Sequence, residues 1–417
     1  MKEDFFKYQA QTTPTPLAIE IASAKGSYIY DTDGKEYLDF VAGVSANTLG
    51  HRPRSVTKAI KKQLDSYTHV MVYGEFVQQP QVELSKLLVK NLPKGLDSVY
   101  LTNSGTEATE GALKLAKRVT NRFEIIAAKN GYHGNSQGAM SVAGNEETKS
   151  AFRPLIPGTK FIEFNNFTAI NKITVKTAAV ILETIQGGAG FIVPEKGYLK
   201  AVKERCKQVG ALLILDEIQS GVGRTGKLFE FENHNIVPDI LITGKGLGGG
   251  MPIGAFISSS ENMALLQENP KLGHITTFGG HPVIAAAGLA TLQEVLKPKL
   301  IADISRKEAL FRKSLIHPMI KEIRGKGLML ALLIDTPELA SQIILRALDK
   351  GLILFWLLFE GRAVRITPPL NISDEEITKG CNILIEVMDN VFCDCNYLEW
   401  AGALPKHHAH LENNPLK

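Results

Sequence analysis

Short apolar runs that alternate with helical patterns constrain the fold of this chain more than any other feature of its sequence. The runs "SVYLT", "FEIIAA", "TAAVILE", "ALLILDE" and "DILITG" lie between residues 98 and 244, and glycine-rich or polar turns follow them. Strands that read as continuous hydrophobic runs are typical of a parallel sheet with helices on both faces. The pattern therefore predicts an α/β fold with a mainly parallel sheet.

The length of the chain, 417 residues, allows a large domain and a smaller one. We expect the α/β core to span residues 60–300. The flanking segments 1–59 and 301–417 show patterns of a different kind, and we expect them to form a smaller α+β domain together.

Local signals predict particular elements in these flanking segments. "GSYIYDTDGKEYLDF" alternates around Asp33 and Gly34, which predicts a β-hairpin. Ser373 stands three residues before Glu376, a spacing that predicts a capped helix start. "GLILFWLLF", residues 351–359, is the most apolar stretch; it is too short to cross a bilayer and predicts a buried strand.

Composition argues against several classes of protein. Apolar residues make up 44% of the chain and charged residues 22%, as in an ordinary globular protein. The net charge is only +4 and the basic residues are scattered, so no nucleic-acid footprint is visible. The start, "MKEDFFKYQAQTTP", lacks the apolar core of a signal peptide, and no stretch has the length of a membrane span. We expect a cytoplasmic protein.

The four cysteines, at positions 206, 381, 393 and 395, predict a reducing compartment and no disulfide framework. A metal site is the alternative for the last two, because histidines stand at positions 407, 408 and 410. The single residue between these cysteines does not match the usual spacing of zinc ligands. A polar C-terminal tail is the better interpretation.

Polar side chains follow directly after the predicted strands. Asp216, Glu217 and Gln219 come after "LLIL", and Lys245 comes after "DILITG". Ligands of open parallel sheets bind beyond the carboxyl ends of the strands. We therefore expect these side chains to crowd one rim of the sheet.

A phosphate-sized anion fits the turn "TNSGTEATEGALK". Ser104 and Glu107 have the spacing of a capping box, and Gly105 and Thr106 leave backbone N–H groups at a helix N-terminus. An ordinary capped helix would show the same pattern. The motif alone leaves both interpretations open.

Lys245 stands between glycines, which let another group approach closely. Lysine is the residue for Schiff-base chemistry when burial or a nearby charge depresses its pKa. "LLILDE" also resembles the acidic strand of a P-loop nucleoside triphosphatase, but that site needs an upstream G-x-x-x-x-G-K-[ST]. Here Lys245 lies downstream and Gly246 follows it, which argues against a triphosphatase.

An anion site, a strand-end carboxylate and a strand-end lysine together suit a phosphorylated pyridine aldehyde. Asp216 would keep the ring nitrogen protonated, so that the ring withdraws electrons, and Lys245 would carry the aldehyde.

The chain resembles the class III (ω-amino acid) aminotransferases, which are fold-type I pyridoxal-phosphate enzymes. The resemblance runs from about residue 18 to about residue 390. It rests on "NSGTEATEGALKLAKR", "GYHG", "ETIQGG", "LDEIQSGVGRTG", "GKGLGGGMPIGA", "TTFGGHP" and "VRITPPL", in the order of the family. It implies a pyridoxal 5'-phosphate cofactor and a fold of one large and one small domain.

By position, the resemblance gives roles around the cofactor ring. Lys245 would hold the aldehyde carbon and move the proton, and Asp216 would pair with the ring nitrogen. Gln219 would lie near the phenolic oxygen. Ile218 would cover one face of the ring, and Tyr132 would stack on the other.

The resemblance also implies contacts further from the ring. Gly105 and Thr106 would take the phosphate, and Glu183 of "ETIQGG" belongs to the cofactor-binding set. Thr277 of "TTFGG" resembles a residue that reaches the phosphate bound in the partner subunit, which implies a homodimer. Arg365 of "VRITPPL" matches the arginine that binds the substrate carboxylate.

Two positions depart from the pattern of ornithine, acetylornithine and 4-aminobutyrate aminotransferases. Asn135 replaces a second arginine that usually follows "HG". Gly188 replaces a glutamate that commonly masks the carboxylate-binding arginine. Substrates that need a second carboxylate clamp, or a masked Arg365, are therefore in doubt.

The expected reaction moves an amino group, with the ω-amine of acetylornithine, ornithine or 4-aminobutyrate as candidates, to 2-oxoglutarate or pyruvate by ping-pong kinetics. Decarboxylation, amino-group migration or phosphate elimination on the same cofactor is the alternative. A non-catalytic dimeric protein is a third hypothesis, but Lys245 and Asp216 are both present.

Overall fold

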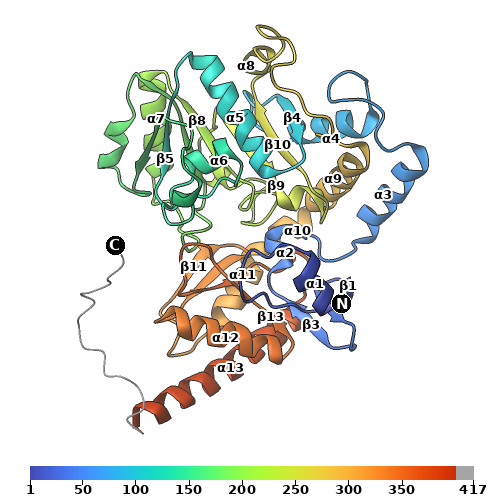
Figure 1. Cartoon of the computed structure of the whole chain (residues 1–417), viewed down its shortest axis with the longest axis vertical. Coiled ribbons are helices and arrows are strands. Elements are labelled where there is room, and N and C mark those ends of the chain that lie inside the picture. Colours follow the sequence, from blue (N-terminus) through green and yellow to red (C-terminus); the bar gives the residue numbers. More distant parts are fainter. Residues whose placement is uncertain (401–417) are drawn as a thin grey trace.

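The structure is a computed structural model that describes the backbone of residues 1–400 and the side chains of residues 1–394. Figure 1 shows two lobes, one around a large sheet and one that joins the two ends of the described chain. The α-helices are α1 (Lys2–Tyr8), α2 (Ala42–Ser45), α3 (Arg54–Ser66), α4 (Gln79–Lys90), α5 (Gly105–Thr120), α6 (Gln137–Val142), α7 (Tyr198–Val209), α8 (Ser260–Ala264), α9 (Pro282–Val295), α10 (Pro298–Ala302), α11 (Ile304–Ser314), α12 (Pro337–Asp349) and α13 (Asp374–Trp400). None of the helices described is long and apolar enough to cross a membrane.

The large sheet confirms the predicted α/β fold. Its strands, in spatial order, are β4 (Ser98–Thr102), β10 (Gly254–Ser258), β9 (Ile240–Gly244), β8 (Leu212–Asp216), β7 (Thr177–Glu183), β5 (Glu124–Ala128) and β6 (Thr159–Ile162). Neighbouring strands from β9 to β6 are parallel, and β10 runs antiparallel to both of its neighbours.

Both faces of this sheet are buried, which is why its strands read as continuous apolar runs. On β8, Leu213 and Leu215 join a core with the residues of α4, α7 and α9. Ile214 faces the other way and packs with α5. Alternate side chains of one strand therefore support two different helical layers.

Two smaller sheets lie in the second lobe. One has the order β1 (Ile21–Lys25), β2 (Tyr28–Asp31), β3 (Glu36–Asp39), β13 (Leu352–Ile353), and the other has the order β11 (Glu322–Lys326), β12 (Met329–Leu333), β15 (Ala363–Ile366), β14 (Phe355–Trp356). Leu38 and Phe40 share one core with residues between Ile304 and Val391. On this basis we propose the domain division expected from the sequence, 60–300 against 1–59 with 301–417.

The local predictions have mixed outcomes. The hairpin is confirmed, since β2 pairs antiparallel with β3. The cap at Ser373 is confirmed, since its hydroxyl accepts from the Glu376 N–H at 3.2 Å and the Glu376 carboxylate accepts from the Ser373 N–H at 2.9 Å. The capping box at Ser104 is only half formed: its hydroxyl accepts from the Glu107 N–H, but the Glu107 carboxylate accepts from the Asn103 N–H.

The prediction of one buried strand over residues 351–359 is wrong. The run is divided, because β13 pairs with β3 in one sheet while β14 pairs with β15 in the other. Leu358, beyond both strands, has 59% of its surface exposed. Some apolar side chains of this segment therefore lie at the surface and not in a core.

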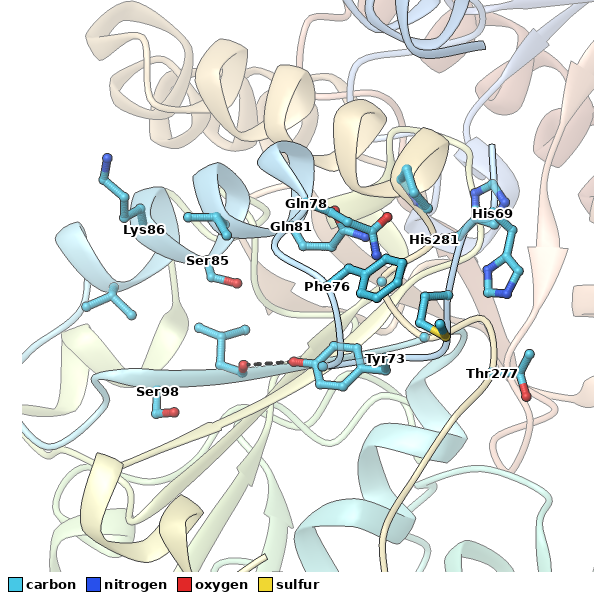
Figure 2. A pocket seen from close by; sticks show the side chains of 18 of the residues that line it. His69, Tyr73, Phe76, Gln78, Gln81, Ser85, Lys86, Ser98, Thr277 and His281 are labelled. Atoms are coloured by element: carbon cyan, nitrogen blue, oxygen red, sulfur yellow. Dashed lines mark hydrogen bonds between the residues drawn. The ribbon is translucent and has the colours of Figure 1, made fainter. Parts of the chain in front are cut away.

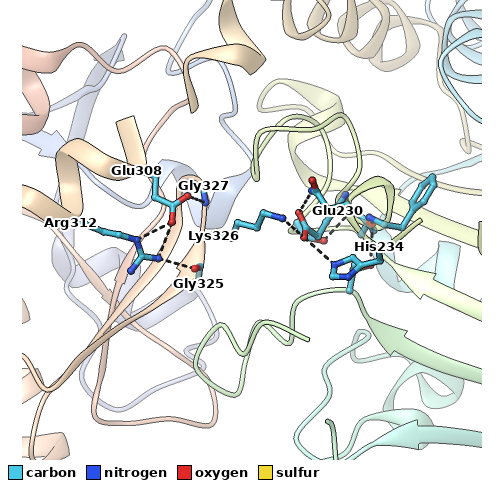
Figure 3. Close-up of polar contacts among 12 residues, drawn as sticks. Glu230, His234, Glu308, Arg312, Gly325, Lys326 and Gly327 are labelled. Atoms are coloured by element: carbon cyan, nitrogen blue, oxygen red, sulfur yellow. Dashed lines mark hydrogen bonds and ion pairs between the residues drawn. The ribbon is translucent and has the colours of Figure 1, made fainter. Parts of the chain in front are cut away.

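A polar contact joins the two lobes (Figure 3). The turn after β11 is fixed because the Glu308 carboxylate accepts from the Gly327 N–H at 2.6 Å and pairs with Arg312 at 2.9 Å. Lys326 is the last residue of β11, directly before this turn, and its ammonium lies 2.8 Å from the fully buried carboxylate of Glu230 in the larger lobe. Burial alone would raise the pKa of Glu230, but hydrogen bonds from His234 and Lys326 outweigh it and lower that pKa.

Replacing Lys326 with methionine is expected to lower the free energy of unfolding by about 1–2 kcal/mol at pH 7, because the Glu230 carboxylate stays buried without its main cation. Urea unfolding followed by circular dichroism measures the change. Lys321→Met is the matched control, because its pair with Asp335 is about half exposed on both sides and is expected to contribute less than about 0.5 kcal/mol. Equal losses in the two variants would contradict a specific role for the contact between lobes.

Candidate active site

A cavity of about 520 Å³ opens at the carboxyl ends of β7, β8 and β9. It brings together the site residues predicted from the sequence, with the exception of Thr277 and Glu217. The predicted residues that line it are Gly105, Thr106, Tyr132, Glu183, Asp216, Ile218, Gln219, Lys245 and Arg365. Side chains from both lobes therefore meet in one space, as expected at the carboxyl edge of an open parallel sheet.

The N-terminus of α5 forms one end of the cavity, and two glycines leave space at this end. A Cβ added to Gly105 would lie 2.6 Å from the Ile218 side chain. A Cβ added to Gly134 would lie 2.3 Å from the Thr106 hydroxyl, which is 2.8 Å from the Ser136 hydroxyl. Free N–H groups at a helix start, with hydroxyls beside them, favour a bound phosphate.

Asp216 is held in a fixed orientation by two contacts. Its Oδ2 lies 2.8 Å from Nδ1 of the buried His133, and its Oδ1 accepts from the Ile218 N–H at 3.0 Å. The motif "GYHG" was recognised in the sequence, but this role of His133 was not. Only the position of His133 beside Tyr132, after a predicted strand, could have suggested it.

Glu183 lies beside Asp216, because the two residues are paired across β7 and β8. Its carboxylate accepts from the Tyr132 N–H at 2.9 Å and from the Gly187 N–H at 2.8 Å. Burial raises the pKa of Glu183 to about 7; the charge of His133 opposes this, and that of Asp216 adds to it. In this structure Glu183 supports the backbone at Tyr132.

Glu217 does not lie on the rim, contrary to expectation. Its carboxylate does not line the cavity and instead accepts from the Glu230 and Phe231 N–H groups, both at 2.6 Å. Thr184 donates to it at 3.0 Å. Successive side chains at a strand end point to opposite sides, so Asp216 enters the cavity while Glu217 binds the start of the 3-10 helix Glu230–His234.

Lys245 directly follows β9 and has a φ of 40°, in the left-handed region. Loss of water lowers the pKa of its ammonium, and the positive charge of Arg365 lowers it further, although Asp216 and Glu183 oppose the change. A lowered pKa increases the share of neutral amine, which is the nucleophilic form.

Arg365, on β15, is a buried cation without an acidic partner among the described residues. Its Nε and Nη2 reach only the Trp356 carbonyl, both at 3.4 Å, and its buried Nη1 has no partner among the described residues. Burial lowers its pKa to about 10, so the guanidinium stays charged at neutral pH. The cavity therefore offers a positive group suited to a carboxylate.

Thr277 lies elsewhere, on the edge of a second cavity of about 660 Å³ (Figure 2). Tyr73, Phe76 and His281 line the same space, and the Tyr73 N–H donates to the Thr276 carbonyl at 3.2 Å. In a single chain Thr277 therefore does not reach the first cavity.

Metal ligands are not grouped anywhere in the part of the chain that the structure describes. The Cys395 and histidine positions of the alternative tail site lie outside the described side chains.

Comparison with known proteins identifies the family. The profile "Aminotransferase class-III" matches residues 8–388. The acetylornithine aminotransferase of Caldanaerobacter subterraneus subsp. tengcongensis is 38% identical over 89% of this chain and 95% of its own, and that of Methanopyrus kandleri is 36% identical over 92% and 97%. The solved ornithine aminotransferase of Toxoplasma gondii, with PLP at partial occupancy in its active site, superposes with a TM-score of 0.88 at 31% identity, over 95% of this chain and 96% of its own.

The chain belongs to the class III aminotransferases. It is a pyridoxal 5'-phosphate-dependent transaminase of fold type I, as the sequence motifs predicted.

Proposed function

We propose that this transaminase takes an amino group from a donor whose amine is remote from its carboxylate and passes it to a 2-oxo acid. Acetylornithine, ornithine and 4-aminobutyrate are the donor candidates. The observation that supports the proposal is the convergence of Lys245, Asp216 and Arg365 on one cavity. A cytoplasmic location stays a prediction from the sequence.

The residues of the cavity fit the cofactor. Thr106 and the N-terminus of α5 would hold the phosphate. The buried amide nitrogen of Gln219, which has no partner among the described residues, would face the phenolic oxygen. Ile218 and Tyr132 would enclose the ring. When bound, the cofactor supplies an aldehyde and an electron-withdrawing pyridinium ring.

Each of these residues then has a separate role in the reaction. The Asp216 carboxylate, oriented by His133, would stabilise a proton on the ring nitrogen. The Lys245 amine would bind the aldehyde and would serve as the acid and base that moves a proton at the substrate. Arg365 fixes the substrate carboxylate. Donor and acceptor use the same space in turn, which gives ping-pong kinetics.

An absorption spectrum tests the function directly. The purified protein with pyridoxal 5'-phosphate is expected to show a visible band that bleaches with a competent donor and returns with a 2-oxo acid. A band that no amino donor bleaches would favour the decarboxylase, mutase or lyase alternatives. Failure to form any band would argue for a non-catalytic protein.

We also propose a homodimer in which each chain completes the other's site. Apolar side chains are exposed beside the second cavity, in the two adjoining segments 70–77 and 275–278. They are Val70, Met71, Phe76, Val77, Ile275 and Phe278. A contiguous exposed apolar surface suits a protein partner, and Thr277 would enter that partner's phosphate site.

Mixed dimers test this arrangement. Thr277→Ala is expected to weaken cofactor binding by about 10-fold, the effect of losing one hydrogen bond to a charged group. Mixing it with Lys245→Ala is expected to restore sites of parental affinity and activity, because one site of each mixed dimer then holds both Lys245 and the partner's Thr277. Cofactor titration before and after subunit exchange measures this. If mixing restores nothing, Thr277 acts within its own chain or not at all.

A further inference from the structure

Positive charge is scarce in the first cavity. Among the described residues that line it, only Lys245 and Arg365 are lysine or arginine. Lys245 serves the cofactor in the proposed function. Within one chain, Arg365 is therefore the cation left to bind a substrate anion.

Apart from Lys245, Arg365, His133, Glu183 and Asp216, the described residues that line the cavity are uncharged, and we call them the neutral wall. Asn135, an exposed neutral residue, lines the cavity close to the phosphate end, next to Gly134. Val44, Ile185 and Leu357 are apolar lining residues from three separate segments. A second carboxylate placed against such side chains would lose its water without gaining a cation, and this is strongly unfavourable.

A carboxylate at position 188 could neutralise Arg365, but this chain has Gly188 there. A Cβ added to Gly188 would lie 3.0 Å from two carbons of the Phe359 ring and 3.6 Å from the Leu358 Cβ. The Phe359 N–H also donates to the Gly188 carbonyl at 2.9 Å. The apolar segment packs directly on the glycine, which has no side chain that could neutralise Arg365, so Arg365 stays available in both half-reactions.

The mouth of the cavity is apolar as well. Phe355 and Leu358 line it and are both exposed, by 39% and 59% of their surfaces. Large apolar side chains at the entrance of a binding site favour substrates whose far end is small or apolar.

From this distribution of charge we propose that the amino-group acceptor is a monocarboxylic 2-oxo acid with a small or apolar side chain, such as pyruvate or 2-oxobutyrate, in preference to the dicarboxylic 2-oxoglutarate. The inference rests on the proposed function and specifies its acceptor. Arg365 binds the only carboxylate of the acid, and the side chain of the acid faces the neutral wall.

The transfer is balanced without any further reactant. The amine nitrogen of the aminated cofactor passes to C2 of the acid, and the carbonyl oxygen of the acid passes, through water, to the cofactor. The cofactor is oxidised from amine to aldehyde while the acid is reduced to an amino acid, and Lys245 moves the proton. No step requires a second carboxylate on the acid.

The acceptor half-reaction can be measured without knowing the donor. Protein reconstituted with pyridoxamine 5'-phosphate is mixed with pyruvate, 2-oxobutyrate or 2-oxoglutarate, and the return of the aldehyde band gives a second-order rate constant. Pyruvate or 2-oxobutyrate is expected to react at least about 10-fold faster than 2-oxoglutarate, the ratio that about 1.4 kcal/mol of discrimination gives. In the reverse direction, L-alanine is expected to bleach the pyridoxal form faster than L-glutamate.

A charge added to the neutral wall supplies the second test. Asn135→Arg is expected to raise the rate with 2-oxoglutarate at least about 10-fold relative to pyruvate, because the second carboxylate gains a cation. Asn382→Arg is the matched control, since it adds the same charge to an exposed position of α13 outside the cavity. The ratio between the two acids is expected to stay unchanged in that control.

Three results would overturn the inference, and they are distinguishable. Parent protein that reacts with 2-oxoglutarate as fast as with pyruvate, or faster, would refute the acceptor class while leaving aminotransfer intact. Parent protein whose aldehyde band returns with none of the acids would refute the proposed function as well. An equal shift of selectivity in Asn135→Arg and Asn382→Arg would show that the local charge of the cavity does not choose the acid.

Discussion

Replacing Lys245 with alanine is expected to lower kcat by at least about 10³-fold, since the variant loses both its nucleophilic amine and the group that moves the proton. The amine is suited to both tasks, because loss of water and the charge of Arg365 lower its pKa. The variant should still bind the cofactor through Thr106 and the N-terminus of α5. Its visible band should shift, because the aldehyde is no longer bound to a protein amine.

Three measurements make the test specific to Lys245. Steady-state turnover and the absorption spectrum report the loss, and added methylamine should restore part of the turnover by replacing the missing amine. Lys200→Ala, at an exposed position on α7, is the control and should behave like the parent. Normal turnover in Lys245→Ala would remove this lysine from the mechanism.

The sequence predicted the central sheet and much of the cavity because both depend on local patterns. Asp216 and Lys245 each end an apolar run, and β8 and β9 proved to be parallel neighbours, with Asp216 opposite Ile242. Two residues at the carboxyl ends of adjacent parallel strands must lie close together. This rule requires no knowledge of the distant parts of the chain.

Contacts between distant segments could not be predicted in the same way. His133 and Asp216 are separated by 83 positions, and their hydrogen bond depends on the order β8–β7–β5 in the sheet. Glu217 has the same sequence context as Asp216, but its carboxylate binds N–H groups at the start of the distant 3-10 helix Glu230–His234. The prediction of one strand over 351–359 fails because hydrophobicity does not distinguish a core from an apolar cavity mouth.

Asp216→Asn is expected to lower kcat by about 10²–10³-fold, the usual effect of removing one group that stabilises developing charge in an enclosed site. The asparagine has the same shape, so the Ile218 N–H contact and the position beside His133 should survive. What is lost is the negative charge that favours a proton on the ring nitrogen. Single-turnover rates with a competent donor would measure the effect apart from product release.

A modified cofactor separates the charge of Asp216 from its role in folding. A pyridoxal phosphate methylated at the ring nitrogen is positively charged at any pH and needs no protein anion. It is expected to restore at least about 10-fold of the rate in Asp216→Asn, which corresponds to about 1.4 kcal/mol of recovered stabilisation. The methylated cofactor should not improve the parent, whose Asp216 already holds the ring nitrogen protonated. If the methylated cofactor is bound, with the fold intact by circular dichroism, and still does not raise the rate of the variant, that result would contradict a role for the charge. Asp216 would then act by positioning the ring through its contact with His133.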